Sequence, residues 1–350
     1  MTAPAFTPAV SALRIAPPDS SFDRAPVTVA WETTRACHLK CLHCRAEAQP
    51  RRHPLELTTV EGISVISQAA GMGVRVFVIT GGDPLMRPDV FDLIGEVSAA
   101  GMHCGFSPSA TRKLSARALE QAVEAGAATV HLSLDGASAE SHDRFRGVPG
   151  SFARTLTAID AARGLGVRVQ VGTTVSTRTA HELEQMVPLL TGRISLWSLF
   201  FLVPTGRAQM ADVLTAQGHE HVLRWLAESE FPFAVRSVAA PTHRRVLSEL
   251  GQRVPPGVND GNGFAFVSHV GDVCPSGFLP LPAGNVRSTS LAEIYRESAL
   301  FRALRDPALL SGRCGRCTYQ TVCGGSRARA WAMTGDPLAS DPTCAYQPAG

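Results

Sequence analysis

The sequence lacks the long apolar segment that a membrane-spanning helix needs. No unbroken run in its 350 residues approaches the roughly 20 apolar residues that cross a bilayer. Residues 1–25 are rich in Ala and Pro, but they lack the basic start and continuous apolar core of a secretion signal. We therefore expect a loose leader over residues 1–25 and a cytoplasmic protein without a membrane span.

An excess of charge of either sign is also missing. The chain has 33 Lys and Arg residues against 30 Asp and Glu residues, which gives a formal net charge of +3. This balance does not favour a nucleic acid or an anionic membrane surface as the main partner. Because 45% of the residues are hydrophobic, the chain can bury a substantial core. We expect one large globular domain, alone or with a smaller appendage.

Cysteine, in contrast, is abundant. The nine cysteines fall into an early group at positions 37, 41 and 44, one residue at 104, and five between positions 274 and 344. Thiols stay reduced in a cytoplasmic chain, so an odd and clustered set indicates metal or redox chemistry rather than a disulfide framework. The two groups predict two separate metal sites.

Apolar, β-branched segments alternate with helix-like segments from residue 27 onward. The predicted strands are 27–34, 74–80, 103–107, 129–134, 168–175 and 195–203. The predicted helices are 58–70, with a capping box from Thr58 to Glu61, and 87–100, 115–125, 151–165 and 179–190. Four glycines follow these helices, where a left-handed cap favours glycine: Gly71, Gly101, Gly126 and Gly166.

This alternation predicts an α/β fold with a parallel sheet. Six units suit a partial (β/α)6 TIM-like barrel, whose active site lies at the C-terminal ends of the strands. An open, doubly wound sheet is the alternative. The pattern fades after residue 205, and we expect a linker or hairpin region at 252–263, a β-hairpin turning at Gly271-Asp272 and a helix at 290–304.

The early cysteines have the spacing Cys37-x3-Cys41-x2-Cys44, directly after the first predicted strand. Three thiolates on one short loop can hold one face of a cubane iron-sulfur cluster and leave the fourth iron without a protein ligand. Such an open position accepts a substrate or a cofactor. Zinc is the alternative, although structural zinc usually takes four ligands in paired spacings.

In this motif and its position, the chain resembles the radical S-adenosylmethionine (SAM) enzyme superfamily from about residue 25 onward. The resemblance implies that Cys37, Cys41 and Cys44 are catalytic and hold a 4Fe-4S cluster whose free iron binds SAM. It also implies reductive cleavage of SAM to a 5'-deoxyadenosyl radical, which abstracts hydrogen from a substrate carbon. The electron donor would be a reduced flavodoxin or ferredoxin.

Polar residues near the predicted strand ends match the cofactor site of this superfamily. The segment "TGGDPL" (80–85) resembles its GGE-type motif, with Asp83 where Glu is commoner, and "LVPTGR" (202–207) resembles a segment that contacts adenine. His43 stands where an aromatic residue usually packs by the adenine, and Arg146 resembles the arginine that pairs with the SAM carboxylate. The implied cofactor contacts are His43, Gly81, Gly82, Asp83, Pro84, Ser107, Ser133, Asp135, Arg146 and Thr173.

Structural roles are the alternatives for several of these residues. His43 could be a solvent-facing loop residue, and Arg146 could lie on a helix surface. Thr173 and Thr174 could face the cofactor or stabilise their strand.

The distal cysteines have the spacing Cys314-x2-Cys317-x5-Cys323-x20-Cys344. Four thiolates can enclose a cubane completely, which suits electron transfer or structural support. The segment resembles the C-terminal SPASM extension of radical SAM enzymes in its shorter form, with one auxiliary 4Fe-4S cluster. A zinc ribbon is the alternative.

These features divide the chain into a leader at 1–25, a barrel at 26–250 and an auxiliary cluster domain at 251–350.

Two cysteines stay outside the cluster sets. Cys274 could face the substrate or bind an auxiliary iron, whereas Cys104 is expected to be a buried core residue.

The substrate is indicated only by resemblance. The segments "CRAEAQP", "HDRFRGVPGSF", "CGGSRARAWA" and "GDPLASDPTCAYQP" are most similar to the tetrapyrrole-tailoring branch, whose members modify heme-precursor propionates, for example by oxidative decarboxylation. Arg244, Arg245, Arg327 and Arg329 could bind propionates or form structural ion pairs. A peptide-modifying maturase and a non-catalytic iron-sulfur protein, which transfers electrons or senses redox state, are the alternatives.

Overall fold

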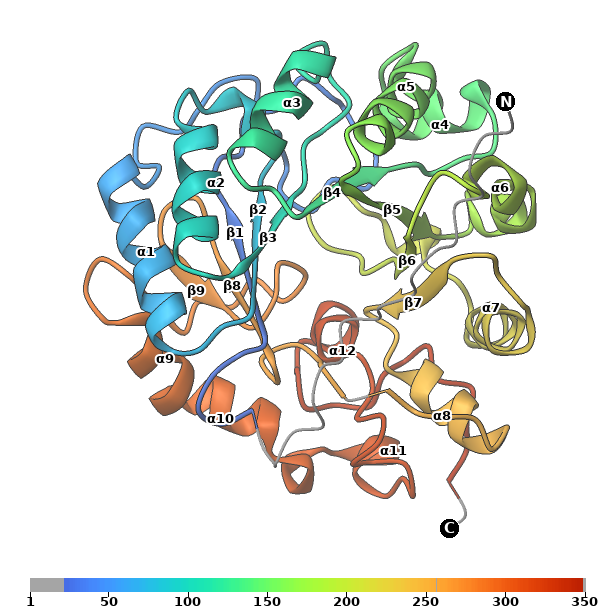
Figure 1. Cartoon of the computed structure of the whole chain (residues 1–350). Coiled ribbons are helices and arrows are strands. Elements are labelled where there is room, and N and C mark those ends of the chain that lie inside the picture. The colour runs from blue at the N-terminus through green and yellow to red at the C-terminus, as the bar shows by residue number, and fades with distance from the viewer. Residues whose placement is uncertain (1–21, 256, 349–350) are drawn as a thin grey trace.

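The computed structural model describes residues 22–255 and 257–348 and contains a barrel-like sheet surrounded by helices (Figure 1). Most of the leader predicted at 1–25 lies outside the described residues. Seven parallel strands are neighbours in the sheet in the same order as in the chain. They are β1 (Thr28–Glu32), β2 (Val76–Thr80), β3 (His103–Phe106), β4 (Thr129–Ser133), β5 (Arg168–Val175), β6 (Leu196–Phe201) and β7 (Ala234–Val238).

This order excludes a doubly wound sheet, in which the strand order reverses partway. Right-handed crossovers between consecutive parallel strands place all connecting helices on one face, and that face becomes the outside of a barrel. Figure 1 shows the helices around the strands. They are α1 (Thr59–Gly71), α2 (Val90–Ala99), α3 (Ala116–Glu124), α4 (Ala139–Arg146), α5 (Ser151–Gly164), α6 (Leu183–Leu190), α7 (Ala216–Glu228) and α8 (Thr242–Glu249).

The alternation of side chains along each strand separates an apolar outer face from a more polar interior. Trp31 and Trp197 are fully buried on the outer face. Trp31 packs so closely on α1 that a Cβ at Gly62 would lie 2.2 Å from its ring. Because successive side chains point to opposite faces, Glu32, Ser133 and Ser198 face the interior.

A late strand completes the sheet on the other side of β1. β8 (Phe264–Val267) pairs in parallel with β1, β9 (Asp272–Cys274) returns antiparallel, and β10 (Gly284–Asn285) pairs with β9. The full order is β10-β9-β8-β1-β2-β3-β4-β5-β6-β7. The predicted hairpin therefore exists, but its turn is Ser268–Gly271, because the Ser268 hydroxyl accepts hydrogen bonds from the amides of Val270 and Asp272.

The remaining helices lie around the end of the chain, below the barrel in Figure 1. They are α9 (Leu291–Glu297), α10 (Ala299–Arg305), α11 (Gly312–Gly315) and α12 (Arg327–Thr334). Short 3-10 turns occur elsewhere in the chain at Pro84–Met86, Ala180–Glu182 and Met210–Asp212, and one follows α10 at Pro307–Leu309. Across the described part of the chain, no helix combines the length and apolarity needed to cross a membrane.

The six predicted strands and the barrel class are confirmed, whereas β7 was not predicted. The helix predicted at 290–304 is wrong in one respect: the extended backbone of Ser298 separates α9 from α10, and its hydroxyl caps α10. Three of the four predicted glycine caps have positive φ. At the end of α1 the left-handed residue is Gly73, with φ +81°, rather than Gly71.

Candidate active site

The loop that follows β1 carries the three early cysteines. Cys37 and Cys41 are buried, and Cys44 is half-buried. The Leu39 amide donates to Cys37 Sγ (3.4 Å), and the Ala48 amide donates to Cys44 Sγ (3.4 Å). Burial raises the pKa of Cys37 to about 11, so metal binding here must release protons. Donors aimed at sulfur are suited to thiolate ligands of a metal cluster.

Glu32, the last residue of β1, holds this cysteine loop in place. Its carboxylate accepts hydrogen bonds from Arg35 Nε (3.1 Å) and Arg45 Nη1 (2.9 Å), and His269 Nδ1 lies 3.1 Å away. Burial opposes ionisation, but Arg45 and the other two partners hold the pKa of Glu32 below its usual value. Sequence reasoning missed this residue, although its position at the end of the first strand was visible.

The glycines of the "TGGDPL" segment permit direct backbone contact with the cysteine loop. The Gly82 amide donates to the Thr34 carbonyl (2.6 Å), and the Asp83 amide donates to the Ala36 carbonyl (2.8 Å). A Cβ at Gly82 would lie 2.6 Å from the Ala36 carbonyl oxygen, and a Cβ at Gly81 would lie 2.7 Å from that of Thr34. Both positions therefore exclude a side chain.

Asp83 orders the rim of the barrel through its buried side chain. Its carboxyl group accepts hydrogen bonds from Thr111 Oγ1 (2.7 Å), the Leu85 amide (3.2 Å) and the Ser109 amide (3.4 Å). Burial raises its pKa despite these donors. Pro84 follows as the first residue of a 3-10 turn. The side chain thus joins the loops after β2 and β3.

Arg146 and Asp135 form a buried ion pair against the cysteine loop. Arg146 Nη2 lies 2.5 Å from Asp135 Oδ2, and its Nη1 donates to Cys41 Sγ (3.6 Å). Burial disfavours both charges, but the pKa of Asp135 is lowered and that of Arg146 is raised because each ion stabilises the other. The position of Arg146 is incompatible with a role as a helix-surface residue.

A hollow beside the cysteine loop brings several of the predicted residues together. Ser133 and Arg146, two of the predicted contacts, line it together with Leu39 and Ser109, and its empty volume is about 220 Å³, part of it open to solvent. Ser107 is not among the residues that line this hollow, and its hydroxyl lies 3.2 Å from His131 Nδ1. His131 was not predicted, although it shares the interior face of β4 with Ser133.

His43 and Arg207 present unpartnered polar atoms beside the cysteine loop. His43 is half-buried and stacks on Phe145 with ring centroids 4.2 Å apart. Burial lowers its pKa to about 3, so the ring is neutral. Gly206, with φ +61°, lets the Arg207 amide donate to the Cys44 carbonyl (3.1 Å). Among the described residues, His43 Nδ1 and Arg207 Nε and Nη2 have no hydrogen-bond partner, so these residues fit a polar cofactor.

Thr173 does not face this site. Its buried hydroxyl donates to the Leu134 carbonyl (2.6 Å) and accepts from Trp197 Nε1 (2.8 Å), on the face of the sheet that packs against helices. The assignment of Thr173 to the cofactor is therefore corrected to a structural role. Its neighbour Thr174 has the opposite strand phase and faces the interior.

The four distal cysteines line one hollow at the surface. Cys314, Cys317, Cys323 and Cys344 surround about 380 Å³ of empty space, part of it open to solvent. The Tyr319 amide donates to Cys317 Sγ and the Gly325 amide donates to Cys323 Sγ, both at 3.4 Å. Burial raises the pKa of Cys323 to about 12. The shared hollow and the amide donors suit a closed cluster with four thiolate ligands.

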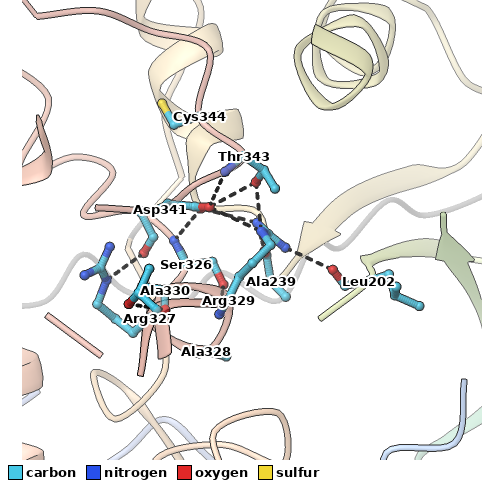
Figure 2. Close-up of polar contacts among 12 residues, drawn as sticks. Leu202, Ala239, Ser326, Arg327, Ala328, Arg329, Ala330, Asp341, Thr343 and Cys344 are labelled. Carbon is cyan, nitrogen blue, oxygen red and sulfur yellow. Dashed lines mark hydrogen bonds and ion pairs between the residues drawn. The ribbon is translucent and has the colours of Figure 1, made fainter. Parts of the chain in front are cut away.

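A buried ionic network links this hollow to the barrel. In Figure 2, the Arg329 guanidinium lies between Asp341 and Thr343 on one side and the carbonyls of Leu202 and Ala239 on the other. Arg329 and Asp341 are both fully buried. Because Leu202 and Ala239 follow β6 and β7, the network fixes the cysteine segment to the strand ends.

The four arginines that could have bound propionates are occupied within the protein. Arg244 donates to the carbonyls of Val322 and Cys323, and Arg327 donates to those of Pro337 and Ala339. Arg245 pairs with Glu220 and Glu249, and Arg329 pairs with Asp341. The structural alternative is therefore correct for all four.

Cys274 and Cys104 lie outside both cysteine groups. Cys274 packs with Ala30 and Phe266 on the interior side of the sheet and is not among the residues that line the distal hollow. Cys104 is fully buried in the outer core, as expected. In the described part of the chain, no three His, Cys, Asp or Glu side chains converge to hold a single metal ion, whereas the thiolates of a cubane each bind a different iron.

A barrel whose first strand is followed by a donor-lined three-cysteine loop fits the class of barrel proteins that hold an iron-sulfur cluster. The Radical SAM superfamily model matches residues 31–190. The AdoMet-dependent heme synthase of Oleidesulfovibrio alaskensis is 40% identical over 339 residues, covering 91% of this chain and 87% of that protein. Mycofactocin maturase MftC of Mycobacterium tuberculosis is 32% identical over 338 residues, covering 91% and 83%.

A solved structure shares the fold. Streptococcus suis SuiB bound to S-adenosylmethionine superposes with a TM-score of 0.74 at 15% identity, covering 92% of this chain and 77% of that one. The chain belongs to the radical SAM superfamily and is an enzyme. The resemblance in the cysteine motif is thereby confirmed, and the non-catalytic alternative is wrong.

Proposed function

We propose that this enzyme removes hydrogen from a propionate side chain of a heme-precursor tetrapyrrole and so brings about its oxidative decarboxylation. The observation that carries this proposal is the 40% identity, over nearly the whole chain, to a protein named AdoMet-dependent heme synthase. When bound, the 4Fe-4S cluster would supply the one electron that cleaves SAM into methionine and a 5'-deoxyadenosyl radical, the reagent needed to attack an unactivated carbon.

The residues of this chain would divide the work as follows. Cys37, Cys41 and Cys44 would hold the SAM-binding cluster, and Arg146 would bind SAM beside it. His43 and the backbone of Gly81 and Gly82 would position SAM, with Asp83, Pro84, Ser107, Ser133 and Asp135 shaping the pocket. Cys314, Cys317, Cys323 and Cys344 would hold one auxiliary 4Fe-4S cluster.

The proposed conversion balances at the substrate. A propionate that loses a hydrogen atom from the carbon next to the ring, then CO2 and one electron, becomes a vinyl group. That electron needs a one-electron acceptor, which is the class of group that the distal cysteines would hold. A reduced flavodoxin or ferredoxin in the cytoplasm would supply the reducing electron, in the compartment where free thiols persist.

A peptide substrate is the second candidate, since the chain is also 32% identical to a protein named mycofactocin maturase.

The enzyme, reconstituted without oxygen, should be incubated with SAM, dithionite and iron-coproporphyrin III, an iron porphyrin with propionates where heme has vinyl groups. For each converted propionate, we expect mass spectrometry to show a porphyrin lighter by the mass of CO2 plus two hydrogen atoms. The reaction should also yield 5'-deoxyadenosine. An unchanged porphyrin alongside a modified candidate peptide would contradict the proposal.

Cysteine variants test the division between the two clusters. Cys41→Ala should abolish formation of 5'-deoxyadenosine, because the SAM-binding cluster loses a ligand. Cys317→Ala should spare uncoupled SAM cleavage but impair porphyrin turnover. Cys104→Ala, a change in the outer core, should keep both activities. Full SAM cleavage by Cys41→Ala would refute the assignment of the open cluster.

A further inference from the structure

Arg236 is an arginine of the barrel interior without a carboxylate partner. It lies in the middle of β7, and its Nε donates to Ser198 Oγ (2.8 Å), which also accepts from Gln170 Nε2 (2.9 Å). No ion pair involves Arg236 within residues 22–255 and 257–348. Since a guanidinium has five N–H donors, most of its hydrogen-bonding capacity is unused.

The other enclosed arginines differ in this respect. Arg146, Arg245 and Arg329 each contact a carboxylate. The side chain of Arg236 shares the interior face of the sheet with Ser198, its partner in β6, and it is open to water. A water-accessible cation on that face can form a charge-assisted hydrogen bond with an anion that enters the barrel.

The surroundings of Arg236 favour an anion. His131 lies near it on the interior face, and burial, together with the charges of Arg236 and Arg146, lowers the pKa of His131 to about 3, so this ring is neutral. The carboxylate of Asp135 also lies near His131, but it is paired with Arg146. Ser198 and Gln170 are uncharged, and the positive charge of Arg236 is thus not balanced locally.

An aromatic wall stands beside this cation. His131 stacks on Phe200 with ring centroids 5.8 Å apart, and Phe278 packs on Phe200 at 6.4 Å. Gly172 makes room for the wall, because a Cβ there would lie 2.5 Å from His131 Nε2. Flat rings with a charged edge bind well where aromatic faces meet one convergent cation.

We propose that Arg236 binds a carboxylate of the substrate inside the barrel, while the His131, Phe200 and Phe278 wall contacts its flat ring. This inference rests on the proposed function, because the ring is a tetrapyrrole only if that function is correct. Binding of one propionate at Arg236 orients the ring toward the cysteine loop, since His131 lies near both Arg236 and the Asp135–Arg146 pair.

The test is a binding titration of the reconstituted enzyme with SAM present. Iron-coproporphyrin III is added without oxygen, and its absorbance reports binding. Loss of a charge-assisted contact should weaken binding to Arg236→Gln by about 10- to 100-fold. Wild type should bind the propionate-amidated porphyrin more weakly than the acid, whereas Arg236→Gln should bind both alike. Arg117→Gln, on the exposed face of α3, is the control with the same charge loss.

Two further measurements separate the possible failures. The iron content and the circular dichroism spectrum of Arg236→Gln should equal those of wild type, which excludes misfolding, and Arg236→Lys should restore part of the preference for the acid. An Arg236→Gln variant that binds like wild type and keeps the preference overturns this inference alone. If wild type binds no porphyrin, the proposed function falls and this inference falls with it.

Discussion

Arg329 shows how one side chain joins distant parts of this enzyme. Its guanidinium contacts Asp341, which precedes Cys344 by three positions, and the carbonyls that follow β6 and β7. Burial opposes ionisation of Asp341, but Arg329 keeps the pKa of that carboxyl well below its usual range. Such a pair is costly to break on one side, because the remaining charge stays buried without compensation.

We therefore expect Arg329→Ala to lower the free energy of unfolding by about 3–5 kcal/mol. Arg302→Ala removes an arginine whose ion pair with Glu297 is largely exposed, so it should cost at most about 1 kcal/mol. Urea unfolding followed by circular dichroism measures both variants. Equal losses in the two variants would show that the network in Figure 2 does not stabilise the fold.

The sequence alone did not show which arginines lack a carboxylate partner within the protein and could therefore bind a substrate anion. Arg244, Arg245, Arg327 and Arg329 lie in conspicuous sequence pairs, yet all have partners, whereas Arg236 stands alone in a short strand and lacks a carboxylate. The difference depends on contacts with segments far away in the chain. Such contacts leave no local pattern in a single sequence.

Among the elements, the loop after β2 contacts the cysteine loop directly through two backbone hydrogen bonds. Gly82→Ala would force a Cβ to within 2.6 Å of the Ala36 carbonyl and displace one loop from the other. If the distal cysteines hold the proposed auxiliary cluster, this variant should lose roughly half of its bound iron, because only the SAM-binding cluster is affected, and it should lose most of its SAM cleavage.

The matched control is Gly71→Ala. Gly71 ends α1, and a Cβ there would meet no atom within 4 Å. This change should keep the iron and alter stability by no more than about 1 kcal/mol. Iron content and 5'-deoxyadenosine yield are the measurements, and a Gly82→Ala variant with full iron would contradict the steric argument.

Strands and helices with strong local signals were predictable from the sequence. β1, β2, β4 and β5 are short segments with apolar and β-branched residues, β3 and β6 carry aromatic residues, and α1 has the capping box expected from Thr58 and Glu61. β7 was not predicted because its sequence, "AVRSV", carries an arginine, and because the strand forms one edge of the sheet, where burial is incomplete. The break at Ser298 escaped because the apolar pattern continues across it.

The parts of the candidate site that form short sequence motifs with a characteristic spacing were predictable. The cysteine sets, Gly81 and Gly82 are compact motifs, so their positions followed from the sequence. The bonds of Glu32 with Arg45 and His269 depend on the pairing of β1 with β8. Thr173 was misassigned because strand phase decides which of two adjacent threonines faces inward.

For the whole molecule, cluster binding and folding should be coupled. The distal hollow is bordered by segments that Arg244 of α8 and Arg329 of α12 connect to the barrel. Ligands that bind only the folded state raise its stability. Enzyme reconstituted with iron and sulfide should have a melting temperature several degrees above that of the iron-free chain. A rise of about 2–4 °C corresponds to roughly 1 kcal/mol of added stability.

The double variant Cys314→Ala with Cys317→Ala separates the two contributions. It should lose part of this stabilisation and keep the part that comes from the early cysteines. Differential scanning calorimetry without oxygen provides the melting temperatures. Identical temperatures for the loaded and iron-free wild type would show that the thiols do not bind a cluster in the folded chain.

The pairing of β1 with β8 has a consequence for synthesis. Thr28 aligns with Phe264, so one edge of the first strand waits for a partner until most of the polypeptide has left the ribosome. An uncovered strand edge invites pairing with other chains. The nascent protein therefore passes through a long interval in which a chaperone that shields this edge would increase the yield of correctly folded enzyme.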